Sequence, residues 1–128
     1  MLIAGIKNTK TDVVTEKNSA KTMGSGLLDV YATPSMIALM EGCCHESITS
    51  ELEEGWGSVG TSLNIKHVSA TPIGMTVRCE SELVKVDGRA LTFEVKAYDE
   101  KGLIGEGVHE RFLIQNEKFM NKTLAKLQ

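Results

Sequence analysis

The sequence has no apolar run that approaches the roughly 18 residues of a membrane-spanning helix. Its start, MLIAGIKNTK, lacks the apolar stretch and the small-residue cleavage site of a secretory signal. We therefore expect a cytoplasmic protein that has no membrane as a partner.

An excess of charge of one sign is also missing. The chain carries 14 lysine and arginine residues against 17 aspartate and glutamate residues, and the two signs are interspersed. Without a single-sign field, neither a nucleic-acid backbone nor an anionic membrane surface is expected as the main partner. Any anionic ligand must then be met by a local cluster of cations.

Cysteine is scarce, and its spacing excludes the common metal motifs. Cys43, Cys44 and Cys79 cannot all pair within the chain, and two adjacent cysteines are poor disulfide partners. No C-x-x-C or H-x-x-x-H spacing is present. We expect reduced, mostly buried thiols, no bound metal and no cofactor.

The composition that remains is typical of a globular protein. Hydrophobic residues make up 41% of the chain and charged residues 24%, and no repeat, low-complexity block or linker interrupts it. Splitting 128 residues would leave two undersized cores, so residues 1–128 are expected to form a single domain.

The clearest predicted element is a helix from about Thr33 to Glu53. Thr33 offers a hydroxyl to cap it, and Pro34 is expected at its first helical position. A loop in which Gly24 and Gly26 come before Leu27 and Leu28 precedes the helix and is a candidate lid. Apolar residues recur along the helix at helical spacing, namely Ile37, Met40, Cys44, Ile48 and Leu52.

Period-two patterns predict the strands. A weak alternation indicates an early strand at residues 12–19. Stronger alternation indicates strands at 58–67, 77–83, 91–97 and 103–114, and a short helix is expected at 116–127.

The turn near Asp87 decides the register of the third and fourth strands. A two-residue turn would pair Leu83 with Thr92 and place the apolar rows on opposite faces of the hairpin. A three-residue loop with Gly88 in the left-handed region pairs Leu83 with Leu91 and places both rows on one face. We expect the second register.

One strand, a long apolar helix and four antiparallel strands form an α+β plan. In this plan a five-stranded sheet wraps around a central helix, which is the hotdog fold. The sheet has exposed edges and one uncovered face, so we expect edge-to-edge pairing into a homodimer or a dimer of dimers.

Two polar side chains are predicted to point toward the core. His67 continues the strand parity of Val59 and Leu63, and Glu41 follows Ile37 by one helical turn. Each has an ordinary explanation, because a core histidine can bond a carbonyl and a glutamate can reach out from an apolar stripe. Together they form a candidate acid/base pair, since burial raises a carboxyl pKa toward the range useful for proton transfer.

A series of short motifs is more specific. Eight positions separate Thr33 from Glu41, and 26 separate Glu41 from His67. The other motifs are Ala32 to Met36, Leu39 to Glu41, Ser58 to Thr61, Ala70 to Pro72, Gly74 to Val77, Val86 to Arg89, Leu91 to Phe93, Ile104 to Gly107 and His109 to Arg111. In residue types and separations, this series resembles the fluoroacetyl-CoA thioesterase family of hotdog enzymes over about residues 24–119.

The resemblance implies that Thr33, Glu41 and His67 are catalytic. It also implies that the backbone amide of Gly60 helps to hold the acyl end of the substrate and that Arg111 lies near the active site. The expected activity is hydrolysis of an acyl-CoA thioester, with coenzyme A as part of the substrate.

The candidate lid has Leu27, Leu28 and Tyr31 where the family enzyme has aromatic residues. Leu27 and Tyr31 are implied to contact substrate, and a short or medium acyl-CoA is the expected substrate class. Eight residues of regular helix rise about 12 Å, which is too far for Thr33 and Glu41 to share a hydrogen bond. Either the chain folds back or the site combines groups from two subunits.

Two other functions remain open. The chain can be a non-catalytic hotdog module that binds an acyl-CoA or a similar small ligand. It can also be a cysteine hydrolase that uses Cys43 or Cys44 with His67. A hotdog hydratase is disfavoured, because the D-x-N-P-x-H signature is absent.

Overall fold

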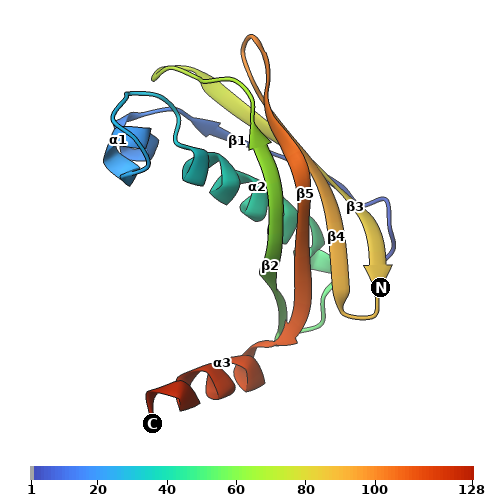
Figure 1. The fold of residues 1–128 in the computed structure, drawn as a ribbon. Coiled ribbons are helices and arrows are strands. Elements are labelled where there is room, and N and C mark those ends of the chain that lie inside the picture. The colour runs from blue at the N-terminus through green and yellow to red at the C-terminus, as the bar shows by residue number, and fades with distance from the viewer. Residues whose placement is uncertain (1) are drawn as a thin grey trace.

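In the computed structural model, which describes residues 2–128, a five-stranded antiparallel sheet curves around one long helix (Figure 1). The strand order is β1-β3-β4-β5-β2, so β1 and β2 form the edges. The α+β hotdog fold expected from the sequence is confirmed. The elements are β1 (Lys7–Val13), α1 (Ala20–Met23), α2 (Thr33–Ile48), β2 (Trp56–His67), β3 (Thr76–Asp87), β4 (Ala90–Asp99), β5 (Gly102–Gln115) and α3 (Asn116–Leu124), with short 3-10 turns at Glu16–Asn18, Thr49–Glu51 and Ala125–Leu127.

The core lies between α2 and the concave face of the sheet. Buried and more exposed residues alternate along β3 and β4, and the buried apolar ones belong to the same apolar cluster as the helix. Each large apolar side chain removed from water contributes roughly 1.5–3 kcal/mol. The main contributors are Met36, Met40 and Ile48 of α2 with Val77, Leu83, Leu91, Phe93 and Val95 of the sheet.

The hairpin of β3 and β4 has a different register from the predicted one. A two-residue turn, Gly88-Arg89, closes it, and Gly88 has the expected left-handed φ of +61°. The bulge that brings the apolar rows to one face is present, but it lies inside β3 at Val84. Leu83 therefore pairs with Phe93. The predicted pairing of Leu83 with Leu91 is wrong.

A second bulge lies in β2. The register of β2 against β5 shifts between Gly60 and Ser62, which leaves Thr61 as the extra residue. Before this bulge the even-numbered residues of β2 face α2, and after it the odd-numbered residues do. Gly60 and His67 consequently both face α2, whereas Val59 lies on the opposite face. The predicted common parity of Val59 and His67 is wrong.

The first strand and the long helix differ from their predicted bounds. β1 covers residues 7–13 rather than 12–19, because a capping box between Thr15 and Asn18 turns the chain. α2 ends at Ile48, and a 3-10 turn replaces most of its predicted last residues. α1 has no counterpart among the predicted elements.

The terminal helix α3 projects from the end of β5 away from the curved sheet (Figure 1). The helix predicted at 116–127 is present as α3 followed by a 3-10 turn, and all of its residues are exposed. No helix among residues 2–128 combines the length and the apolarity that crossing a bilayer requires.

Gly107→Ala should destabilise the fold. Gly107 lies opposite Ile65 of β2, and a Cβ there would overlap the carbonyl oxygen of Asn64. Because a backbone atom cannot rotate away, we expect the free energy of unfolding to fall by about 2–4 kcal/mol. Gly26→Ala is the control, since its Cβ would meet only the Ala20 side chain, at 3.5 Å. Equal urea midpoints for the two variants would contradict the close approach of β2 and β5.

Candidate active site

Thr33 and His67 form a direct hydrogen bond. Thr33 is the first residue of α2, and the helix is capped at Ala32 without a side-chain bond. The predicted cap at Thr33 is therefore wrong. Its Oγ1 lies instead 2.7 Å from Nδ1 of His67, the last residue of β2.

The His67 imidazole is half-buried, and one of its nitrogens is unpaired. Nε2 is buried and has no hydrogen-bond partner among the described residues. Burial lowers the pKa of His67, with the Ser69 backbone opposing the shift, so the ring is neutral near neutral pH. If Nδ1–H donates to Thr33, Nε2 keeps a free lone pair. Such a nitrogen can accept a proton from water or from a substrate.

A cavity of about 390 Å³ lies beside this pair. The loop between α1 and α2 forms one wall, where Leu27 is 89% exposed and Leu28 is 69% exposed. Backbone hydrogen bonds from Ala20 to Val30 and from Lys21 to Leu28 fix this loop against α1. The predicted lid thus gives Thr33 and His67 an apolar wall.

Tyr31 lines the same cavity, but its hydroxyl is engaged elsewhere. Its side chain is buried, and the hydroxyl donates to Oδ2 of Asp12 in β1 at 3.0 Å. Burial, reinforced by the Asp12 carboxylate, raises the pKa of Tyr31. Tyr31 is therefore a neutral donor that ties the loop to β1.

A second polar cluster surrounds Glu41 in the middle of α2. Nη1 of Arg111 lies 3.8 Å from Oε2 of Glu41, and the two side chains are 7% and 39% exposed. Arg111 is fixed by Ser58, because Nε donates to its Oγ at 2.8 Å and Nη2 to its carbonyl at 2.9 Å. Glu41 lies at the rim of the core, where a nearly buried cation faces its carboxylate.

His109 belongs to this cluster, although the sequence motifs assigned it no role. It is fully buried, with Nδ1 2.9 Å from the Ser62 carbonyl and Nε2 3.1 Å from Nη1 of Arg111. Because arginine only donates, Nε2 accepts and Nδ1–H donates, so the ring is neutral. Burial lowers the pKa of His109 and favours that state. The available signal was the spacing of His109 and Arg111, which puts both on one face of β5.

Gly60 completes the cluster because it has no side chain. A Cβ there would lie 2.6 Å from Oε2 of Glu41 and 3.2 Å from Cε1 of His109. The Glu41 carboxylate therefore lies directly over the main chain of β2. Gly60 is also paired with Arg111 across the two strands.

The structure does not bring Glu41 to the Thr33–His67 pair within one chain. α2 is continuous between them, and eight residues of helix rise about 12 Å. We call Thr33 with His67 the Thr33 half-site. Glu41 with Gly60, His109 and Arg111 is the Glu41 half-site. Both half-sites lie on the face of β2 that meets α2.

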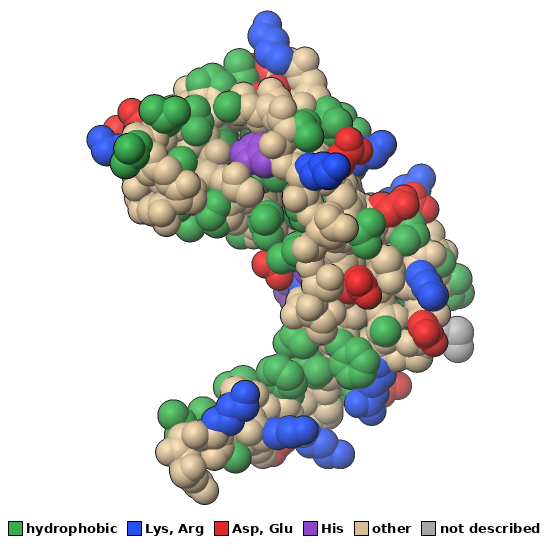
Figure 2. Space-filling model, viewed as in Figure 1, with side chains coloured by type: hydrophobic (Ala, Val, Ile, Leu, Met, Phe, Trp, Pro, Cys, Tyr) green, Lys and Arg blue, Asp and Glu red, His purple; other side chains and the backbone are tan. Residues whose placement is uncertain are grey.

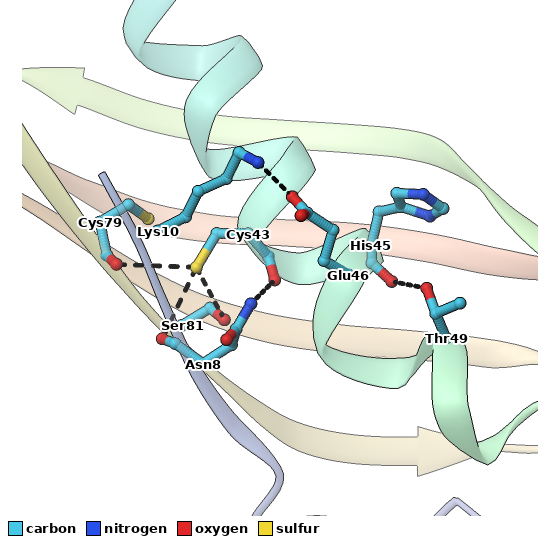
Figure 3. A network of polar contacts seen from close by, with 8 residues as sticks. All are labelled: Asn8, Lys10, Cys43, His45, Glu46, Thr49, Cys79 and Ser81. Carbon is cyan, nitrogen blue, oxygen red and sulfur yellow. Dashed lines mark hydrogen bonds and ion pairs between the residues drawn. The ribbon is translucent and has the colours of Figure 1, made fainter. Parts of the chain in front are cut away.

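The cysteines are poorly placed for catalysis. The Cys43 sulfur contacts the carbonyls of Asn8 and Cys79, each at 3.6 Å, and the Ser81 hydroxyl at 3.4 Å (Figure 3). A side-chain hydrogen bond with the Cys79 thiol lowers the pKa of Cys43 to about 7, but the Cys43 sulfur is enclosed by the core. Burial raises the pKa of Cys44 to about 12. Within the described range, no three His, Cys, Asp or Glu side chains gather as a metal site.

Comparison with known proteins identifies the family. Residues 14–117 match the family described as fluoroacetyl-CoA-specific thioesterase. Over 98 residues the chain is 44% identical to the fluoroacetyl-CoA thioesterase of Streptantibioticus cattleyicolor, which covers 77% of this chain and 70% of that protein. The chain belongs to the fluoroacetyl-CoA thioesterase family. It is a thioester hydrolase, and the resemblance found in the sequence motifs is confirmed.

Solved structures of this family have the same fold. A fluoroacetyl-CoA thioesterase structure superimposes with a TM-score of 0.93 at 36% identity over 98% of both chains. A thioesterase superfamily member from Thermus thermophilus gives 0.88 at 29% identity over 98% of this chain and 92% of that one. A hot-dog-like protein from Thermanaerovibrio acidaminovorans shares the fold alone, with 0.89 at 18% identity over 98% and 93%.

Gly60→Ala should reduce thioester hydrolysis without unfolding the protein. The added methyl group would displace the Glu41 carboxylate, which is the free end of a flexible side chain. A misplacement of about 1 Å can cost catalysis a factor of about 100, so we expect kcat/KM to fall about 10–100-fold. Gly57→Ala is the matched control on the same strand, because its methyl would meet only the Asn116 side chain. A wild-type kcat/KM in Gly60→Ala would contradict the position given to Glu41.

Proposed function

We propose that this protein hydrolyses a short or medium acyl-CoA thioester to the free acid and coenzyme A. The observation that carries the proposal is the Thr33–His67 hydrogen bond, which leaves Nε2 of a neutral imidazole unpaired beside a cavity of about 390 Å³. Membership of a thioesterase family supports the same reaction.

The relatives support an acyl-CoA substrate. The curated relative is a fluoroacetyl-CoA thioesterase, and one similar structure, at 34% identity and a TM-score of 0.94, is a variant of such an enzyme in complex with acetyl-CoA. In this chain the wall of the cavity carries the aliphatic side chains of Leu27 and Leu28. Flexible aliphatic groups provide apolar contact without a specific partner for fluorine. We therefore define the substrate by the size of its acyl group.

In the proposed reaction His67 moves the proton. Nε2 accepts the proton of the attacking water and returns it to the leaving thiolate. The Thr33 hydroxyl accepts from Nδ1–H, which orients the ring and leaves the lone pair of Nε2 free. The N-terminal end of α2 adds positive potential near the oxyanion that forms at the thioester carbonyl.

Glu41 supplies the carboxylate. It either attacks the carbonyl carbon, giving an acyl-enzyme and the coenzyme A thiolate before water cleaves the new bond, or it takes the proton of the water that attacks directly and passes it to Nε2 of His67. In both courses water adds to the acyl group and the thiol leaves with a proton. Arg111 and the backbone at Gly60 position the carboxylate in either course.

The proposal requires the two half-sites to come from different subunits. β2 is an edge strand of 12 residues, and proteins seldom leave so long an edge uncovered. Beside it the surface forms a broad hollow between the α1 end of the molecule and α3 (Figure 2). A second copy related by a twofold axis would fill this hollow and pair with β2.

The spacing along β2 agrees with such a pairing. In antiparallel pairing about an axis at Asn64, Leu63 of one subunit lies opposite Ile65 of the other. Because Thr61 is an extra residue, Gly60 then lies opposite His67. Opposed residues share a face of the sheet. The Glu41 half-site of one subunit would then meet the Thr33 half-site of its partner, and the exposed Leu63 would be covered.

The alternative is a module that binds an acyl-CoA without cleaving it. A binding module has no need for an unpaired imidazole nitrogen or for a carboxylate held by arginine against bare backbone. Both features are present in this chain.

A panel of acyl-CoAs of increasing chain length tests the activity. We expect thiol release with the highest kcat/KM for short or medium chains, and Glu41→Gln should lower it by about 10²–10⁴-fold. Glu46→Gln is the matched control, because Glu46 lies on the same helix but pairs with Lys10 on β1. Binding without turnover, or turnover that Glu41→Gln leaves unchanged, would favour the binding module.

Complementation tests the shared site. Glu41→Gln and the double variant Thr33→Ala/His67→Ala should each be inactive alone. Randomly mixed dimers should recover about a quarter of wild-type activity, because half of them are mixed and each mixed dimer has one intact site. A mixture of Glu41→Gln with Glu41→Ala is the control and should stay inactive. No recovery in mixed dimers identified by native mass spectrometry would rule out the shared site.

A further inference from the structure

A cleft at the opposite end of β2 from His67 combines cations with aromatic rings. It has a volume of about 280 Å³ and lies where α3 leaves the sheet. In Figure 2, lysine and arginine side chains gather over α3 next to an apolar patch at its base. We call this the α3 cleft, and the lining residues that matter here are Trp56, Arg89, Lys118, Phe119 and Lys122.

The α3 cleft is locally basic in an acidic chain. Three of the side chains that line it are cationic and no lining side chain is acidic, whereas the whole chain has a net charge of −3. A neighbouring cleft of about 300 Å³ shares Trp56 but is lined by Glu51 and Glu53. Attraction for an anion is therefore confined to the α3 side of Trp56, where the positive end of α3 also lies.

The aromatic rings restrict the kind of anion. The guanidinium carbon of Arg89 lies 5.0 Å from the centre of the Trp56 ring, and Phe119 adds a second ring that is 38% exposed. Nucleobases stack on aromatic rings and on guanidinium planes, and phosphates bind arginine and lysine. A ligand with both a base and phosphates uses all of these groups, whereas a simple anion uses only the cations.

We infer that the α3 cleft binds the phosphorylated adenosine end of coenzyme A. The inference rests on the proposed acyl-CoA thioesterase function and extends it to the part of the substrate that is remote from the thioester. Adenine stacks at Trp56 and Phe119, while the 3′-phosphate and the diphosphate contact Arg89, Lys118 and Lys122.

The distance along β2 suits this substrate. Trp56, Ser58 and Gly60 share one parity before the bulge, and four residues of strand span about 13 Å. The pantetheine arm contains about as many chain atoms as four residues of backbone. A molecule bound along β2 can therefore reach from the α3 cleft to Gly60.

Trp56 provides a direct test because it is the only tryptophan of the chain. Adenosine 3′,5′-bisphosphate should quench its fluorescence saturably, and Lys118→Gln/Lys122→Gln should raise the dissociation constant about three- to tenfold. Lys126→Gln, further along the same terminal segment and outside the cleft, should bind as the wild type does. Equal quenching by inorganic phosphate, or no effect of the double variant, would overturn the inference.

Steady-state kinetics separate this inference from the proposed function. The double variant should raise KM for an acyl-CoA about three- to tenfold at unchanged kcat. Its kcat/KM for the same acyl group on N-acetylcysteamine, which lacks the nucleotide, should match the wild type. An unchanged KM for acyl-CoA would overturn the nucleotide site and leave the hydrolase intact. If the wild type hydrolyses neither thioester, the proposed function fails, and the Trp56 titration still decides for or against the cleft.

Discussion

The pairing of β2 with β5, shifted by one residue at Thr61, is the constraint on which the site depends. His67 lies seven positions after Gly60, an odd number, so in an unbroken strand the two would face opposite sides of the sheet. The extra residue turns both toward α2. Arg111 then lies across from Gly60, and the Glu41 carboxylate rests on bare backbone between the strands. One inserted residue in an edge strand thus decides what the carboxylate can contact.

The two bulges also mark the limit of what the sequence predicts. The long helix and the strands are predictable because helical spacing, alternation and turn residues are local signals. A bulge depends on the partner strand. To lie on one face, the apolar rows of β3 and β4 require one extra residue, but the sequence does not show whether that residue lies in the turn or at Val84. Likewise, nothing in the alternation of residues 58–67 marks Thr61 as the extra residue of β2.

The site residues show the same division between local and long-range causes. By local rules Thr33 is a helix cap, yet its hydroxyl is hydrogen-bonded to His67, which lies 34 residues further along the chain. His109 resembles any histidine on the inner face of a strand until its two partners, the Ser62 carbonyl and Arg111, are located. Family resemblance singled out Arg111 as a candidate because it compares whole patterns. It could not supply the hydrogen bonds that hold Arg111 in place.

Each half-site is incomplete in a way that is costly for a single subunit. A buried polar atom without a partner, such as Nε2 of His67, costs roughly 1–3 kcal/mol. Arg111 is nearly buried, while the carboxylate that faces it is partly exposed to water, which weakens their attraction. In the proposed dimer, a neighbouring β2 covers the Glu41 rim and brings polar groups toward Nε2. The same contact then offsets both deficits, so covering the edge of the sheet and assembling the reacting groups become one physical event.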